Sequence, residues 1–170
     1  MNNIVLVGFM AVGKSTIGKE LSDILNKIFI DTDEEVEKIE KNNIYNIFKE
    51  KGENYFRNLE TKVLQKVKNQ NNIVLSTGGG IVGKDENITI LKQIGTVIWL
   101  CANEETILKN LKKSTTKRPI LETENVREKI HDLIQVRFEK YKKASDIIIT
   151  VDNKTVKEVV SDILFNLNKM

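Results

Sequence analysis

Short apolar runs alternate along this chain with longer segments in which apolar residues recur at helical spacing. The short runs are three to five residues long and rich in isoleucine and valine. This composition predicts strands of a parallel sheet that are buried on both faces. The predicted strands are Asn3–Val7, Ile28–Ile30, Ile73–Ser76, Thr96–Leu100 and Asp146–Thr150.

The intervening segments carry apolar stripes with the period of an α-helix, and we expect these stripes to pack in the core. Alternation of strand and helix predicts a three-layer α/β fold with a five-stranded parallel sheet and helices on both faces. Ligands of such sheets bind beyond the carboxyl ends of the strands, so residues there are candidates for function. The two clearest stripes are Phe56, Leu59, Val63 and Val67, and Val156, Val159, Val160, Ile163, Leu164 and Leu167.

The length and composition fit a single domain spanning residues 1–170. The only proline is Pro119, and no linker or repeat divides the chain. The net charge of +3 is too small for a nucleic-acid footprint, and no apolar stretch is long enough to span a membrane. We therefore expect a monomeric cytoplasmic protein that binds neither nucleic acid nor membrane.

Cysteine, histidine and tryptophan each occur once in the chain, which limits the chemistry that these residue types can support. Cys101 cannot form an internal disulfide and is predicted to be a buried residue at a strand end. His131 is the only histidine, which removes support for a catalytic triad or a histidine metal cluster, and we expect it on the surface. Trp99 lies in a strand run and is predicted to be a core residue.

The segment Gly8–Ser15 matches the phosphate-binding pattern G-x-x-x-x-G-K-[ST]. It follows the first strand and precedes a helix predicted to run to about Asn26. The backbone N–H groups of such a loop surround phosphates, Lys14 reaches the β- and γ-phosphates, and the Ser15 hydroxyl binds Mg²⁺. The predicted nucleotide-binding residues of this loop are Gly8, Ala11, Val12, Gly13, Lys14, Ser15 and Thr16.

A GTPase is disfavoured. The chain has no D-x-x-G segment, and Val156 stands where the guanine motif starting at Asn153 needs an acid.

The second predicted strand ends in Asp31-Thr32-Asp33. A carboxylate at Asp31 is placed to hold the metal or its water shell. Asp33 could accept the proton of an attacking hydroxyl. Alternatively, Asp33 only caps a helix predicted over Glu34–Glu40.

Glu53, Arg57 and Glu60 are spaced to share one helix face. They form either a solvated ion-pair surface or an arginine fork positioned to bind a substrate carboxylate. The third strand is followed by Gly78, Gly79 and Gly80, more glycines than a tight turn requires, which indicates close approach of another group. A cation-rich stretch, Lys112–Pro119, has the composition of a mobile lid over phosphates or of an ordinary loop.

Taken together, these motifs resemble the shikimate kinase family over nearly the whole chain. The matching segments, in order, are GFMAVGKST at 8–16, DTD at 31–33, GENYFRNLE at 52–60, STGGG at 76–80, RPIL at 118–121, and Arg137 with Tyr141.

The resemblance implies a P-loop kinase fold similar to nucleoside monophosphate kinases. It also implies transfer of the γ-phosphoryl group of ATP to the 3-hydroxyl of shikimate, with Mg²⁺, in aromatic amino-acid biosynthesis. A substrate-binding region at about 32–61 and a lid at about 112–121 follow from it. By the family pattern, the catalytic residues are Lys14, Asp33 and Arg118, and Arg118 also faces the nucleotide. The residues that the pattern assigns to shikimate are Asp33, Arg57, Gly78, Gly79, Gly80 and Arg137. Those that it assigns to the metal are Ser15 and Asp31.

Three positions depart from the family pattern. Ala11 replaces a usual glycine and is tolerable only at negative φ. Leu111 replaces an arginine near the adenine, and the proline usual between Arg137 and Tyr141 is absent, which predicts a more regular helix. The alternatives are another small-molecule P-loop kinase, acting on gluconate or a nucleoside monophosphate, or a non-catalytic nucleotide-binding module.

Overall fold

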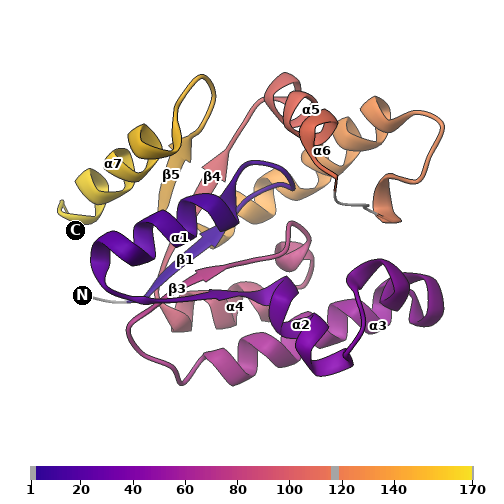
Figure 1. Ribbon diagram of the computed structural model, residues 1–170, viewed down its shortest axis with the longest axis horizontal. Helices are drawn as coiled ribbons and strands as arrows, with labels where there is room; N and C mark the ends of the chain where they lie inside the picture. The colour runs from indigo at the N-terminus through magenta and orange to yellow at the C-terminus, as the bar shows by residue number, and fades with distance from the viewer. Residues whose placement is uncertain (1–2, 116–118, 170) are drawn as a thin grey trace.

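A computed structural model describes residues 3–115 and 119–169. It contains one five-stranded parallel sheet with strand order β2-β3-β1-β4-β5. The first strand is therefore central, flanked by β3 on one side and β4 on the other (Figure 1). The strands are β1 (Ile4–Val7), β2 (Ile28–Asp31), β3 (Ile73–Ser76), β4 (Thr96–Cys101) and β5 (Ile147–Thr150).

Helices cover both faces of this sheet, which confirms the predicted three-layer architecture. In Figure 1, α1 and α7 lie on one side of the sheet and α3 and α4 on the other. The helices are α1 (Lys14–Leu25), α2 (Thr32–Glu40), α3 (Ile44–Val67), α4 (Asp85–Ile94), α5 (Glu104–Lys113), α6 (Val126–Ala144) and α7 (Val156–Leu167), with short 3₁₀ turns η1 (Ile81–Gly83) and η2 (Pro119–Leu121).

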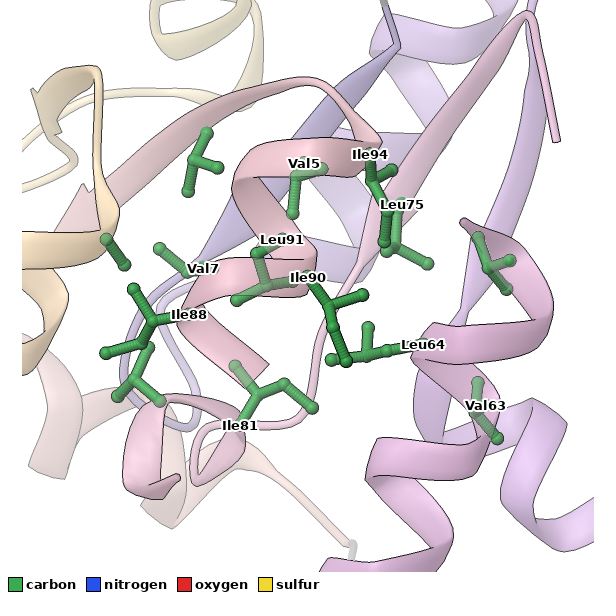
Figure 2. Packing of buried hydrophobic residues seen from close by; sticks show 14 of the residues in the cluster. Val5, Val7, Val63, Leu64, Leu75, Ile81, Ile88, Ile90, Leu91 and Ile94 are labelled. Carbon is green, nitrogen blue, oxygen red and sulfur yellow. The ribbon is translucent and has the colours of Figure 1, made fainter. Parts of the chain in front are cut away.

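The two faces of the sheet build two separate apolar cores. Alternate residues of β1 point to opposite sides, so Val5 and Val7 enter the core beneath α3 and α4 while Ile4 and Leu6 enter the core beneath α1 and α7. Figure 2 shows part of the first core. Its labelled side chains are Val5 and Val7 of β1, Leu75 of β3, Val63 and Leu64 of α3, and Ile81, Ile88, Ile90, Leu91 and Ile94 of η1 and α4.

Both predicted apolar stripes lie in these cores. The α3 stripe is buried throughout. In α7, Val159, Val160 and Ile163 are buried, and the other stripe residues pack partly buried against them. The α7 helix begins with a capping box, in which the Thr155 side chain and Glu158 satisfy each other's backbone N–H groups.

The expectation that every strand is buried on both faces is wrong for the two edge strands. Ile28 of β2 is 61% exposed and Ile148 of β5 is 52% exposed. An edge strand has a neighbour on one side only, and here the helices do not cover its outer residues. Isoleucine-rich composition alone does not distinguish such a strand from a central one.

The residues that occur once behave largely as expected. Trp99 is buried and stacks on Tyr141, with ring centroids 5.5 Å apart. His131 is exposed, and its Nδ1 lies within hydrogen-bond distance of the Glu104 carboxylate. Cys101 ends β4 as predicted but is only partly buried. Within the described part of the chain, every helix is too short or too polar to cross a lipid bilayer.

Candidate active site

The phosphate-binding loop connects the central strand β1 to α1, as the sequence predicts. Its first glycine is required by packing, because a Cβ on Gly8 would lie 2.4 Å from the carbonyl oxygen of Leu100. The Lys14 ammonium is buried and donates hydrogen bonds to the carbonyl oxygens of Gly8 and Phe9, both at 2.8 Å. The lysine thus fixes the curvature of the loop whose N–H groups would face a phosphate.

Ala11 lies in the left-handed region, with φ 62°, so the expectation of a negative φ at this position is wrong. A left-handed conformation costs an L-residue roughly 1–2 kcal/mol because its Cβ crowds the following carbonyl. One contact that opposes this cost is visible: Asn110 of α5 donates a hydrogen bond to the Ala11 carbonyl at 2.8 Å. The loop keeps its shape despite the alanine.

Ser15, in the first turn of α1, and Asp31, at the carboxyl end of β2, come together. The Ser15 hydroxyl donates to Asp31 Oδ2 at 2.7 Å and lies 3.4 Å from the Ser76 hydroxyl. Asp31 is also the N-cap of α2, because its Oδ1 accepts a hydrogen bond from the backbone N–H of Asp33. A hydroxyl beside a carboxylate provides the hard oxygen ligands that Mg²⁺ prefers, so these residues fit the metal.

Asp33 does not cap α2, since Asp31 does and the helix begins at Thr32 rather than Glu34. The Asp33 Oδ1 atom is inaccessible to solvent and has no hydrogen-bond partner among residues 3–115 and 119–169. Burial raises the pKa of Asp33 to about 7, and the nearby Asp31 and Glu60 carboxylates add to the rise, while Lys14 and Arg57 oppose it. A carboxyl with this pKa is suited to accept a proton near neutral pH.

Arg57 is held as a fork between two carboxylates of its own helix. Its Nη1 donates to Glu60 Oε2 at 2.7 Å, and its Nη2 donates to Glu53 Oε1 at 3.0 Å. The Glu60 side chain is completely buried, so the three residues are not a solvated ion-pair surface. Gly52 has left-handed dihedral angles, φ 79°, which kink α3 one residue before Glu53 and separate this segment from the preceding turns.

The glycines after β3 lie against the acidic and basic groups just described. A Cβ on Gly78 would be 2.6 Å from Glu60 Oε1 and 2.7 Å from Asp33 Oδ1. A Cβ on Gly80 would be 2.3 Å from Arg57 Nη1. The glycines therefore leave the space that these charged groups occupy.

Arg137 reaches the same place from α6 and is buried. Its Nη1 donates to the Gly79 carbonyl at 3.2 Å. The hydroxyl of Tyr141, one turn later on α6, donates to the same oxygen. The sequence points to Tyr141 only through the family pattern. Its spacing of four residues from Arg137, which places both side chains on one helix face, is the sequence feature that indicates a shared role.

These side chains surround a cavity of about 550 Å³, a size suited to a small molecule. Phe48, Phe56, Ile44 and Ile120 supply apolar surface beside the charged groups. The polar residues at its wall include Asp33, Glu37, Arg57, Glu60, Gly78, Gly79, Gly80 and Arg137.

A second cavity of about 430 Å³ adjoins the other side of the phosphate-binding loop. Val12 and Gly13 line it together with Lys109 and Asn110 of α5 and with the loop after β5. Leu111 does not line this cavity and packs partly buried against the core instead. Of the predicted lid, Lys112 and Lys113 end α5, whereas Arg118 lies outside the described residues.

The fold and these two cavities define a class. The phosphate-binding loop follows the central strand. On one side of it lies a cavity beside the loop backbone, and on the other a cavity lined by both arginines and carboxylates. This is the arrangement of a P-loop kinase for small molecules.

Comparison with known proteins identifies the family. The family model described as "Shikimate kinase" matches residues 10–168. The shikimate kinase of Alkaliphilus oremlandii is 45% identical over 98% of this chain and 99% of its own length, and that of Persephonella marina is 43% identical over 96% of this chain and 98% of its own. The structure of shikimate kinase from Acinetobacter baumannii in complex with shikimate superposes with a TM-score of 0.95 at 33% identity, covering 99% of this chain and 94% of that one.

The chain belongs to the shikimate kinase family. This confirms the resemblance found in the motifs, and with it the fold class and the kinase activity that the sequence predicts.

Proposed function

We propose that this chain transfers the γ-phosphoryl group of ATP to the 3-hydroxyl of shikimate, giving shikimate 3-phosphate and ADP. The observation that carries the proposal is the cavity beside the phosphate-binding loop, which brings Asp33, Arg57 and Arg137 together from three different helices. Shikimate has one carboxylate and three hydroxyls, and these groups complement two guanidinium groups and a carboxylate.

The roles of the residues follow from their positions. Arg57 and Arg137 pair with the substrate carboxylate, and Asp33 accepts hydrogen bonds from hydroxyls and orients one of them. The three glycines allow the ring to approach the backbone. The substrate-binding region at about 32–61 contributes Phe48 to the wall of the cavity, and the lid at about 112–121 contributes Ile120.

On the nucleotide side, the residues of the loop from Gly8 to Thr16 hold the phosphates. Lys14 stabilises negative charge on the transferred group, and Arg118 adds a second cation from the lid. Ser15 and Asp31 hold Mg²⁺, which compensates the charge of the β- and γ-phosphates when bound.

The reaction is an in-line displacement. The substrate oxygen forms a bond to the γ-phosphorus while the bond from phosphorus to the bridging oxygen of ADP breaks, and the hydroxyl proton passes to Asp33. Most of the acceleration comes from positioning and charge stabilisation. The raised pKa of Asp33 makes it a stronger base than an ordinary aspartate.

A coupled assay of ADP release tests the proposal, with shikimate, gluconate and nucleoside monophosphates offered as separate acceptors. We expect ADP formation that depends on shikimate. Formation with gluconate or a nucleotide but not with shikimate contradicts the proposal, and no turnover with any acceptor favours a non-catalytic nucleotide-binding module.

Two further parts of the proposal come from the sequence. We expect a monomer, which light scattering after size exclusion tests, and a cytoplasmic enzyme, which fractionation of cells of the source organism tests.

A further inference from the structure

Tyr141 is buried behind the substrate cavity and does not line it. Its ring stacks on Trp99 with an interplanar angle of 20°, so the core fixes the position of the ring. The hydroxyl of Tyr141 points to the glycine segment that follows β3, where it donates a hydrogen bond to the Gly79 carbonyl. Burial raises the pKa of this hydroxyl, so it remains protonated and can donate, while a hydrogen bond from the Arg137 side chain to the hydroxyl opposes the rise.

The Gly79 carbonyl accepts two hydrogen bonds, one from Tyr141 and one from Arg137. A carbonyl oxygen has two lone pairs, so two donors use its full capacity and fix the orientation of the peptide. This matters at a glycine, whose backbone is otherwise the least restricted of any residue. The peptide is also confined on its other side, since a Cβ on Gly79 would be 3.0 Å from the backbone nitrogen of Met10.

The hydrogen bond to the Gly79 carbonyl helps to set the orientation of the Arg137 guanidinium. This guanidinium lies 5.7 Å from the centre of the Phe9 ring, and Gly79 provides the backbone oxygen that receives its Nη1. Tyr141 and Arg137 lie one helical turn apart on α6, so both reach the same oxygen from one face of the helix. If the Tyr141 hydroxyl is removed, the Gly79 peptide loses one of its two anchors and the guanidinium loses a fixed partner.

We propose that Tyr141 is a positioning residue for the acidic end of the substrate: its hydroxyl locks the Gly79 carbonyl and thereby aims the Arg137 guanidinium at the substrate carboxylate. This inference rests on the proposed function, because it takes shikimate as the ligand of Arg137. In this role Tyr141 acts on the shikimate side of the site. On the nucleotide side, Lys14 itself braces the phosphate-binding loop through the Gly8 and Phe9 carbonyls.

The test is Tyr141→Phe in the full-length enzyme, with steady-state kinetics for both substrates. The carboxylate contact is made in the ground state and in the transition state alike, so losing it weakens binding uniformly. We expect the KM for shikimate to rise about three- to tenfold, the range for one hydrogen bond, while kcat and the KM for ATP change by less than about twofold. Calorimetric titration with shikimate should give the same increase in Kd.

Ser145→Ala is the control. It removes a hydroxyl at the end of α6 that also donates to one backbone carbonyl, that of Lys142 at 3.3 Å, but does not line the substrate cavity. Its shikimate KM should stay within about twofold of the wild-type value. Thermal melts of both variants measure any loss of stability separately from the kinetic constants.

A lower melting temperature with an unchanged shikimate KM in Tyr141→Phe would make Tyr141 a purely structural residue and overturn the inference. An equal rise in the KM for ATP and for shikimate would overturn it too, because the effect would then not be specific to the carboxylate side. If the wild-type protein forms no ADP with shikimate, the proposed function itself is wrong, which is a different and recognisable outcome.

Discussion

The carboxyl of Asp33 allows the electrostatics of the site to be tested without any ligand. Its Oδ1 is buried without a hydrogen-bond partner in the described part of the chain, and its pKa is raised from 3.8 to about 7, first by burial and then by Asp31 and Glu60. Asp33→Asn removes the titration and keeps the side-chain size. The variant should therefore lose a dependence of stability on pH that the wild-type protein has.

The direction and size of this pH dependence of stability follow from the linkage between proton binding and folding. The folded protein keeps the Asp33 proton up to about pH 7, whereas the unfolded chain releases it near pH 3.8. The stabilisation is complete below the unfolded value and is lost as the pH rises through the folded value. Between pH 5 and pH 8 the wild-type protein should lose roughly 2.5 kcal/mol of stability that Asp33→Asn does not lose.

Urea unfolding at pH 5, 6, 7 and 8, followed by the fluorescence of Trp99, measures this difference. With a slope of about 1–3 kcal/mol per molar urea, the gap between the two midpoints should shift by roughly 1 M across the range. Groups that do not interact with Asp33 titrate alike in both proteins and cancel in the comparison. Parallel stability profiles of the two proteins over this range would refute the reasoning, whatever their constant offset.

The Asp33→Asn variant should bind ATP but lose turnover. Normal turnover would show that Asp33 takes no part in the reaction.

Three further substitutions test other parts of the site. Gly80→Ala should push the Arg57 guanidinium aside and raise the shikimate KM at least about tenfold, the scale of a charge-assisted contact. The melting temperature should also fall, because the displaced guanidinium leaves the buried Glu60 carboxylate without its ion-pair partner. Gly83→Ala, whose Cβ meets nothing within 4 Å, is the control, and equal kinetics of the two variants would contradict the prediction. Lys14→Ala should lower kcat by roughly 10²–10³, and a kcat near that of the wild type would show that the lysine does not stabilise the transferred group. Ala11→Gly should raise the stability by up to about 1 kcal/mol, since it relieves the positive φ, and a lower unfolding midpoint in urea would argue against strain at this position.

Much of the fold could be predicted because its signals are local. Five short Ile- and Val-rich runs gave the strands to within one residue at each end, and the phosphate-binding loop fixed where the first helix begins. The errors concern surroundings that the local sequence does not contain. Ile28 and Ile148 belong to strands as predicted, but their exposure depends on which strands end up at the edges of the sheet.

The site residues illustrate the same limit. Their types and order predicted a phosphate-binding loop and an arginine fork, yet three details needed coordinates. The cap of α2 is Asp31 rather than Asp33, Ala11 has a positive φ, and Glu60 is wholly buried. The conformation of Ala11 involves a neighbour from another part of the chain, the Asn110 side chain on its carbonyl. The cap of α2 is a local contact, but the sequence offers two aspartates two residues apart and does not say which of them caps the helix.

The buried carboxylates make this site costly to fold. Among the residues that the structure describes, Asp33 Oδ1 and Glu60 Oε1 are inaccessible and have no hydrogen-bond partner, and both lie within 3 Å of the position that a Cβ on Gly78 would occupy. An unsatisfied buried acceptor costs about 1–3 kcal/mol, so the two together oppose folding noticeably. Because both oxygens are covered, the hydroxyls of a substrate in the cavity would not supply the missing donors. The cost therefore persists when the substrate binds, and an alanine at Gly78 would add a clash with both oxygens.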